Sequence, residues 1–213
     1  MKVMKATKAR RARKQQLIVP ATFAGRKAWE HQAWHTVQRT FSKHGIAFVP
    51  LCLSRSQTFS AAEPFLSHLS SPPTALLLTC LPDALAVAPK PASPYTRAWL
   101  IELKSTVRDT FALRARDFAA MWLWQAVLVV VHLPTQQAFA SPIEDLPAPL
   151  RLFIPSPQIS PFDAAGLKLL RQRFPDVQVI EGIRVAAGSK APFALWRLCD
   201  LQPLETLIGG ERK

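Results

Sequence analysis

Apolar side chains recur at helical spacing in residues 25–44, where Trp29, Ala33 and Val37 are separated by four residues each. This spacing places them on one face of a helix, so the pattern predicts an amphipathic helix. Gly45 follows directly and is expected to end it, because glycine is common just past a helix C-terminus.

The rest of the chain alternates short apolar runs with proline-rich connections. Runs rich in β-branched and aromatic residues favour strands. We expect strands at residues 46–53, 74–87, 97–104, 126–133, 151–154, 177–180 and 193–198, and helices at 110–124 and 161–174. Residues 54–73 are rich in Ser and Pro and predict a loop. The order of these elements predicts an α/β fold, with a central mixed sheet flanked by helices.

Charged side chains interrupt the predicted strand at residues 97–104. Glu102 and Lys104 are two residues apart, so they point to the same face of the strand. Asp83 lies near the end of the preceding strand, after Pro82. A surface ion pair at an exposed hairpin end is the alternative interpretation. The apolar surroundings count against it, because unpaired charge is costly there.

This combination of side chains suits metal-dependent hydrolysis of a phosphodiester. Asp83 and Glu102 would supply the hard oxygen ligands that Mg²⁺ prefers, with Mn²⁺ as a substitute, and the carbonyl of Leu103 is a further candidate ligand. A bound metal lowers the pKa of water. Lys104 would orient the water or stabilise developing negative charge.

Pro82-Asp83 followed by Glu102-Leu103-Lys104 resembles the PD-(D/E)XK nuclease superfamily, across residues 25–133. The run from Gly25 to Glu30 is also similar to the first helix of archaeal-type Holliday-junction resolvases. The resemblance implies a restriction-endonuclease-like core and a DNA endonuclease that acts as a homodimer. It also implies that Glu30 assists the metal site, whereas an ordinary solvated helix glutamate is the alternative.

The charge balance favours a polyanionic partner. Lys and Arg number 27 against 14 Asp and Glu, giving a formal net charge of +13. The candidate DNA contacts are Lys8, Arg10, Arg11, Arg13, Lys14, Arg26, Lys27, Ser105, Arg108, Arg114 and Arg116. The cations before Glu30 precede every acidic residue, so a nucleic-acid-binding arm and a merely solubilising tail both remain open.

We therefore expect a flexible basic arm at residues 1–24, a nuclease core at 25–133 and a C-terminal α/β extension at 134–213. Other proteins of a recombination or transposition complex are possible partners. A non-catalytic nucleic-acid-binding or assembly subunit, or an RNA-binding protein, is the alternative function. No stretch is long enough to predict a membrane span. We expect a cytoplasmic protein, associated with the nucleoid in a bacterium, with its cysteines buried and reduced.

Overall fold

The computed structural model describes residues 23–51, 82–88, 97–155, 158–182 and 191–209. The basic residues Lys8, Arg10, Arg11, Arg13 and Lys14 lie outside this part, as do the loop expected at 54–73 and the first half of the strand expected at 74–87. Within helix α2 (Phe23–Lys43), the side chain of Arg26 is also outside the description.

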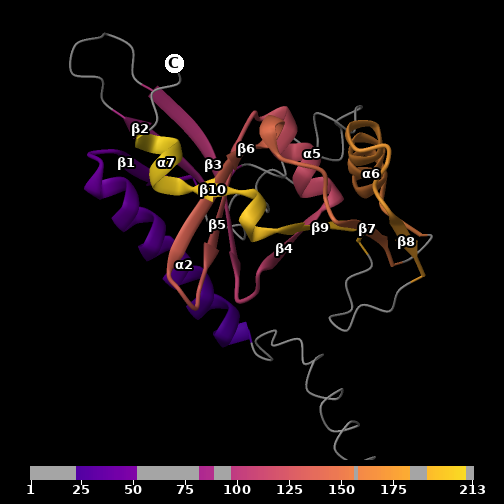
Figure 1. Ribbon diagram of the computed structural model, residues 1–213, viewed down its shortest axis with the longest axis horizontal. Coiled ribbons are helices and arrows are strands. Elements are labelled where there is room, and N and C mark those ends of the chain that lie inside the picture. The colour runs from indigo at the N-terminus through magenta and orange to yellow at the C-terminus, as the bar shows by residue number, and fades with distance from the viewer. Residues whose placement is uncertain (1–22, 52–81, 89–96, 156–157, 183–190, 210–213) are drawn as a thin grey trace, which may run out of the picture.

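A mixed six-stranded sheet forms the centre of the molecule (Figure 1). Its strands are β1 (Ala47–Pro50), β2 (Ala84–Ala88), β3 (Arg97–Thr106), β5 (Val127–His132), β6 (Gln137–Pro142) and β10 (Gln202–Pro203), in the order β1-β2-β3-β5-β6-β10. Strands β3 and β5 pair in parallel, with Glu102 opposite Leu128 and Lys104 opposite Val130. The other neighbours in this sheet pair antiparallel.

Helix α2 covers one face of this sheet. Its Ala33, Val37 and Phe41 are buried together with Ile101 and Val129 of the sheet. The short helix α7 (Leu204–Gly209) joins the same hydrophobic cluster through Leu204. Burial of this apolar stripe, rather than helix propensity, explains why the long α2 is stable.

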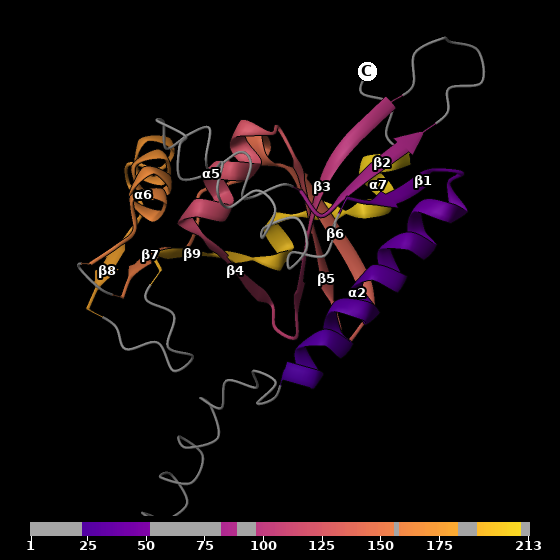
Figure 2. The same cartoon turned by 180° about the vertical axis from the view of Figure 1, so that it is seen from behind.

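The opposite face is covered by helix α5 (Ala115–Leu123), against which helix α6 (Pro161–Arg173) packs. A second sheet adjoins these helices, in the order β4-β9-β7-β8. Its strands are β4 (Thr110–Arg114), β7 (Arg151–Ile154), β8 (Val179–Glu181) and β9 (Phe193–Arg197). Figure 2 shows α2 on one side of the central sheet, with α5 and α6 on the other.

Trp196 anchors the core between the two sheets. It is fully buried and stacks on Phe111 and Phe118, with ring centroids 5.9 Å and 6.2 Å away. Its Nε1–H donates a hydrogen bond to the carbonyl of Pro147 at 2.8 Å. The indole is therefore buried without leaving a polar atom unsatisfied, as a stable core requires.

These elements confirm the expected α/β class, with a central mixed sheet flanked by helices. The helix expected over 110–124 was wrong in its first part, since residues 110–114 form strand β4. In β4 Phe111 and Leu113 alternate with exposed residues, and the strand pairs with β9. The sequence pattern also missed β6, β10 and α7.

Both sheets cross the boundary expected at residue 133. Strands β6 and β10 extend the sheet that contains β3, and β4 pairs with β9. Cys199 is exposed rather than buried, and Cys52 and Cys80 lie outside the described residues. No helix in the described parts of the chain is long and apolar enough to cross a membrane.

Candidate catalytic site

Asp83 and Glu102 approach each other because β2 and β3 are antiparallel neighbours. Ala84 pairs with Ile101, and Asp83 directly precedes Ala84 just as Glu102 directly follows Ile101. The backbone N–H of Leu103 donates to Oδ2 of Asp83 at 2.8 Å. The carbonyl of Asp83 accepts a hydrogen bond from the N–H of Leu51 at 2.9 Å. Both ends of Asp83 are thus held by backbone groups of neighbouring segments.

Lys104 links the strand carboxylate to a second acidic residue on α5. Its Nζ lies 2.6 Å from Oε1 of Glu102 and 3.7 Å from Oδ2 of Asp117. The Glu102 side chain is only 12% exposed and that of Lys104 is 28% exposed. An ion pair at this depth is screened less by salt than one on the surface.

Burial and neighbouring charges shift the proton affinities of this pair. Burial raises the pKa of Glu102 to about 7, and the carboxylates of Asp83 and Asp117 add to the rise although Lys104 opposes it. Burial alone would lower the pKa of Lys104. The attraction of Glu102, Asp117 and Asp83 outweighs that effect, so the pKa of Lys104 is raised and its ammonium stays charged. Clustered titratable groups with shifted pKa values are typical of functional sites.

Asp117 is the residue of this site that sequence reasoning missed. It lies in the first turn of α5, where a negative charge is favourable. Its Oδ1 also lies 3.5 Å from Nε of Arg116. A helix expected from residue 110 placed Asp117 in mid-helix, without a reason to face the strands. Recognising that Phe111 and Leu113 alternate as in a strand would have moved the helix start to the right position.

The donor atoms fit a divalent cation of the Mg²⁺ type, since the carboxylates of Asp83 and Glu102 are hard oxygen ligands on adjoining strands. Among the described residues, no three His, Cys, Asp or Glu side chains are close enough together to hold a metal ion. Mg²⁺ typically needs only one or two carboxylates, with water and phosphate oxygens completing its shell. The role of the Leu103 carbonyl stays a prediction.

The structure does not bring Glu30 and Ser105 to this group. Glu30 is exposed on α2, which packs on the opposite face of the sheet from α5. Ser105 directly follows Lys104 on β3, so its side chain points to the other face. Strand alternation therefore separates Ser105 from Lys104 although the two are adjacent in sequence.

Of the arginines expected to contact DNA, Arg108 and Arg114 lie on the segment that leads from β3 to α5, and Arg116 lies in the first turn of α5. Arg108 and Arg114 are exposed, whereas Arg116 is half-buried and ion-paired with Asp117. Lys27 is exposed near the start of α2. Arg108 and Arg114 thus offer solvent-accessible charge between the strand that carries Glu102 and the helix that carries Asp117.

The fold itself, rather than a comparison with known proteins, places the chain among the mixed α/β proteins. No family model matches the chain, and no curated protein matches it. One solved structure, described as that of D212, a nuclease from a fusselovirus, matches 91% of this chain and 94% of its own chain, at 10% identity and a TM-score of 0.39. At this identity and TM-score the similarity assigns neither a family nor an activity to this chain.

Proposed function

We propose that this protein is a metal-dependent DNA endonuclease with a PD-(D/E)XK type of site. The observation that carries the proposal is the convergence of Asp83, Glu102 and Lys104, with Lys104 held 2.6 Å from Glu102 inside a largely buried strand. Clustering of like charges at this depth is unfavourable for stability alone. A function that uses the charges accounts for it.

The chain's own residues would divide the work as follows. Asp83 and Glu102 would hold Mg²⁺ or Mn²⁺, which when bound neutralises phosphate charge and acidifies a water. Asp83 is oriented for this by the Leu103 amide, which donates a hydrogen bond to one of its carboxylate oxygens. Lys104 would keep its proton and stabilise negative charge that develops on the phosphate. Asp117 would hold the ammonium in place when Glu102 turns towards the metal.

DNA is the proposed substrate because the chain carries a formal net charge of +13. Arg108 and Arg114 are exposed on the segment between β3 and α5 and would contact phosphates. The basic residues before Glu30 would add further contacts. A homodimer, and partners in a recombination or transposition complex, follow from the superfamily resemblance and belong to the same proposal.

Cleavage assays on purified full-length variants test the proposal. Asp83→Ala and Lys104→Ala should each reduce cleavage of labelled duplex, nicked, forked or four-way DNA in Mg²⁺ or Mn²⁺ by at least about 100-fold, as loss of a charge-stabilising group does. DNA binding should stay within about threefold, because each variant changes one charge among many.

Matched controls come from exposed charges elsewhere. Glu144→Ala and Lys168→Ala remove an acid and a lysine that are exposed on other elements, and should leave cleavage unchanged. Undiminished cleavage by both site variants would refute the mechanism. If DNA affinity is the same with and without divalent metal and no DNA form is cleaved, a non-catalytic assembly subunit would be favoured instead. The same result with preference for RNA would favour an RNA-binding protein.

A further inference from the structure

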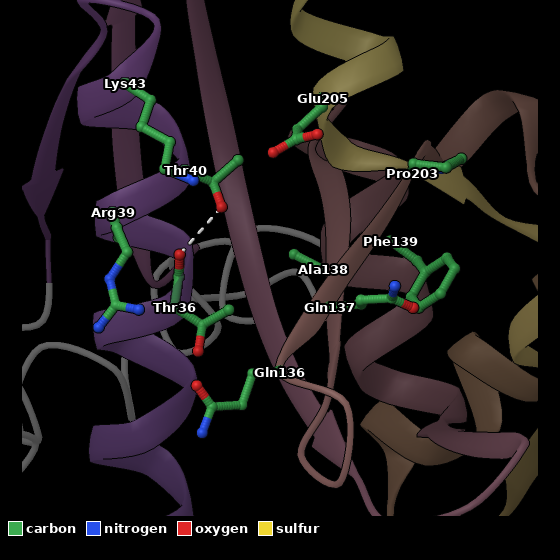
Figure 3. Close-up of a pocket in the computed structure, with 10 residues that line it drawn as sticks. All are labelled: Thr36, Arg39, Thr40, Lys43, Gln136, Gln137, Ala138, Phe139, Pro203 and Glu205. Atoms are coloured by element: carbon green, nitrogen blue, oxygen red, sulfur yellow. Dashed lines mark hydrogen bonds between the residues drawn. The ribbon is translucent and has the colours of Figure 1, made fainter.

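A polar cavity lies on the side of the central sheet that α2 covers, and none of the residues that line it belongs to the candidate catalytic site. It has a volume of about 350 Å³ and opens between α2, the β5–β6 turn and the start of α7 (Figure 3). Ligand pockets start at about 300 Å³, so the cavity suits a molecule of nucleotide size. We call it the α2 cleft.

Two cations from α2 line the α2 cleft. Arg39 and Lys43 are four residues apart and therefore lie on the same side of the helix. Within the described part of the chain neither forms an ion pair. Their charge is therefore available to an anionic group, and both arginine and lysine are common phosphate ligands in proteins.

The same cavity offers hydrogen-bond acceptors, so its ligand must also bring donors. Thr36 and Thr40 donate their hydroxyl protons to the carbonyls of Gln32 and Thr36, at 2.9 Å and 3.0 Å. Their oxygen lone pairs are left for a ligand. The carboxylate of Glu205 points from α7 towards α2 in Figure 3. A ligand with both phosphate oxygens and hydroxyl donors satisfies both sets of groups, whereas inorganic phosphate satisfies only the first.

The backbone conformation of Gln136 is a second, independent indication that the α2 cleft binds a ligand. Its φ of 53° lies in the left-handed region, which is unfavourable for a residue with a side chain. Glycine would fit this turn with less strain, yet the chain has a glutamine whose side chain points towards Thr36 across the cleft (Figure 3). Strained backbone of this kind is concentrated at ligand sites.

We infer that the α2 cleft binds a sugar phosphate, either in a free mononucleotide or at the phosphorylated end of a nucleic-acid strand. Arg39 and Lys43 bind the phosphate, and Glu205 with the threonine hydroxyls accepts hydrogen bonds from the sugar hydroxyls. Gln136 closes the turn side of the cleft. The site is independent of the proposed catalytic chemistry, because α2 and α5 cover opposite faces of the sheet.

Isothermal titration of the full chain tests this inference. The Asp83→Ala variant in EDTA serves as the parent, so that no probe is cleaved. The probes are adenosine monophosphate, inorganic phosphate, and one short RNA strand with and without a 5′-phosphate, because the terminal ribose of RNA keeps a free 2′-hydroxyl. In this background, Arg39→Gln with Lys43→Gln should weaken binding of adenosine monophosphate by at least about tenfold, since each charge-assisted contact contributes strongly.

The matched control is Arg151→Gln with Arg197→Gln, which removes the same charge from exposed positions of the second sheet and should change affinity less than twofold. Stronger binding of the mononucleotide than of the strand identifies a free nucleotide. Stronger binding of the 5′-phosphorylated strand than of either the mononucleotide or the unphosphorylated strand identifies a strand end. Equal losses in control and cleft variants, inorganic phosphate binding as tightly as the mononucleotide, or absence of saturable binding would each overturn the inference.

Discussion

A single lysine holds together the acidic groups of the candidate catalytic site. Lys104 contacts Glu102 and Asp117, and it offsets their mutual repulsion and that of Asp83. The attraction of Lys104 does not fully offset the effect of burial on Glu102, because the pKa of this carboxyl group is still raised to about 7. Near neutral pH this carboxyl group therefore changes its charge, and a divalent cation would favour the charged form.

Glu102 makes stability depend on pH in a defined direction. Its pKa rises from 4.5 to about 7 on folding, so the folded state binds the proton more tightly than the unfolded state does. The protonated carboxyl group therefore adds to the free energy of unfolding, and this added stability is fully present below pH 4.5. It is lost as pH rises through 7. The unfolding free energy of the parent protein, relative to Glu102→Gln, should fall by on the order of 3 kcal/mol across this window. Urea denaturation at pH 4.5 and pH 8 measures it, and a pH-independent difference would contradict the prediction.

The position of Asp117 depends on how two helices and a strand meet. The N–H of Ala115 donates to the carbonyl of Pro192 at 2.8 Å, which ties the start of α5 to the residue before β9. Gly166 of α6 lies against the same turn, and a Cβ on it would come within 2.2 Å of the Ala115 carbonyl oxygen. Only glycine allows this approach, so α6 and β9 together fix the first turn of α5.

Gly166→Ala should destabilise the fold by about 1–3 kcal/mol, because the added methyl group forces the backbones of α5 and α6 apart. Chemical denaturation measures the loss. Gly209→Ala is the matched control, since a Cβ there meets nothing within 4 Å, and its stability should change by less than about 1 kcal/mol. Equal effects of the two changes would show that the contact at Gly166 is not close in solution.

Sequence patterns within one strand or helix predicted the features that depend only on that element. Alternation along one strand was enough to place Glu102 and Lys104 on a common face, and the periodicity of α2 was confirmed. Strand β4 gave a weaker local signal, because the alternation of Phe111 and Leu113 covers only five residues that run directly into α5, and its partner β9 is remote in sequence. Asp117 was missed for the same reason, since its place depends on that remote pairing.

At the scale of the whole molecule, the two sheets form one connected structure. Strand β3 lies in the first sheet and β4 in the second, and the chain passes between them at residues 106–110. Oγ1 of Thr106 donates to the carbonyl of Thr110 at 2.7 Å and accepts from the N–H of Arg108 at 3.1 Å. This buried hydroxyl stabilises the corner between β3 and β4, at which Arg108 is exposed to solvent.

The basic segment before α2 should dominate the salt dependence of DNA binding. Replacing Lys8, Arg10, Arg11, Arg13 and Lys14 together by glutamine removes five charges from the full chain. If all five contact phosphates, the slope of log affinity against log salt should become shallower by about 4.5, since each neutralised phosphate contributes close to 0.9. Fluorescence anisotropy over a salt series measures this slope. An unchanged slope would identify the segment as a solubilising tail.

The pairing of β4 with β9 also has a consequence for biosynthesis. Residues 110–114 cannot pair with their neighbouring strand until residues 193–197 have been synthesised. Likewise, β6 cannot pair with β10 until residues 202–203 have been synthesised. Contacts so remote in sequence slow folding. The emerging chain therefore carries Glu102 and Lys104 long before Asp117 is fixed beside them. Assembly of the candidate site is thereby deferred until residues 193–197 have been synthesised.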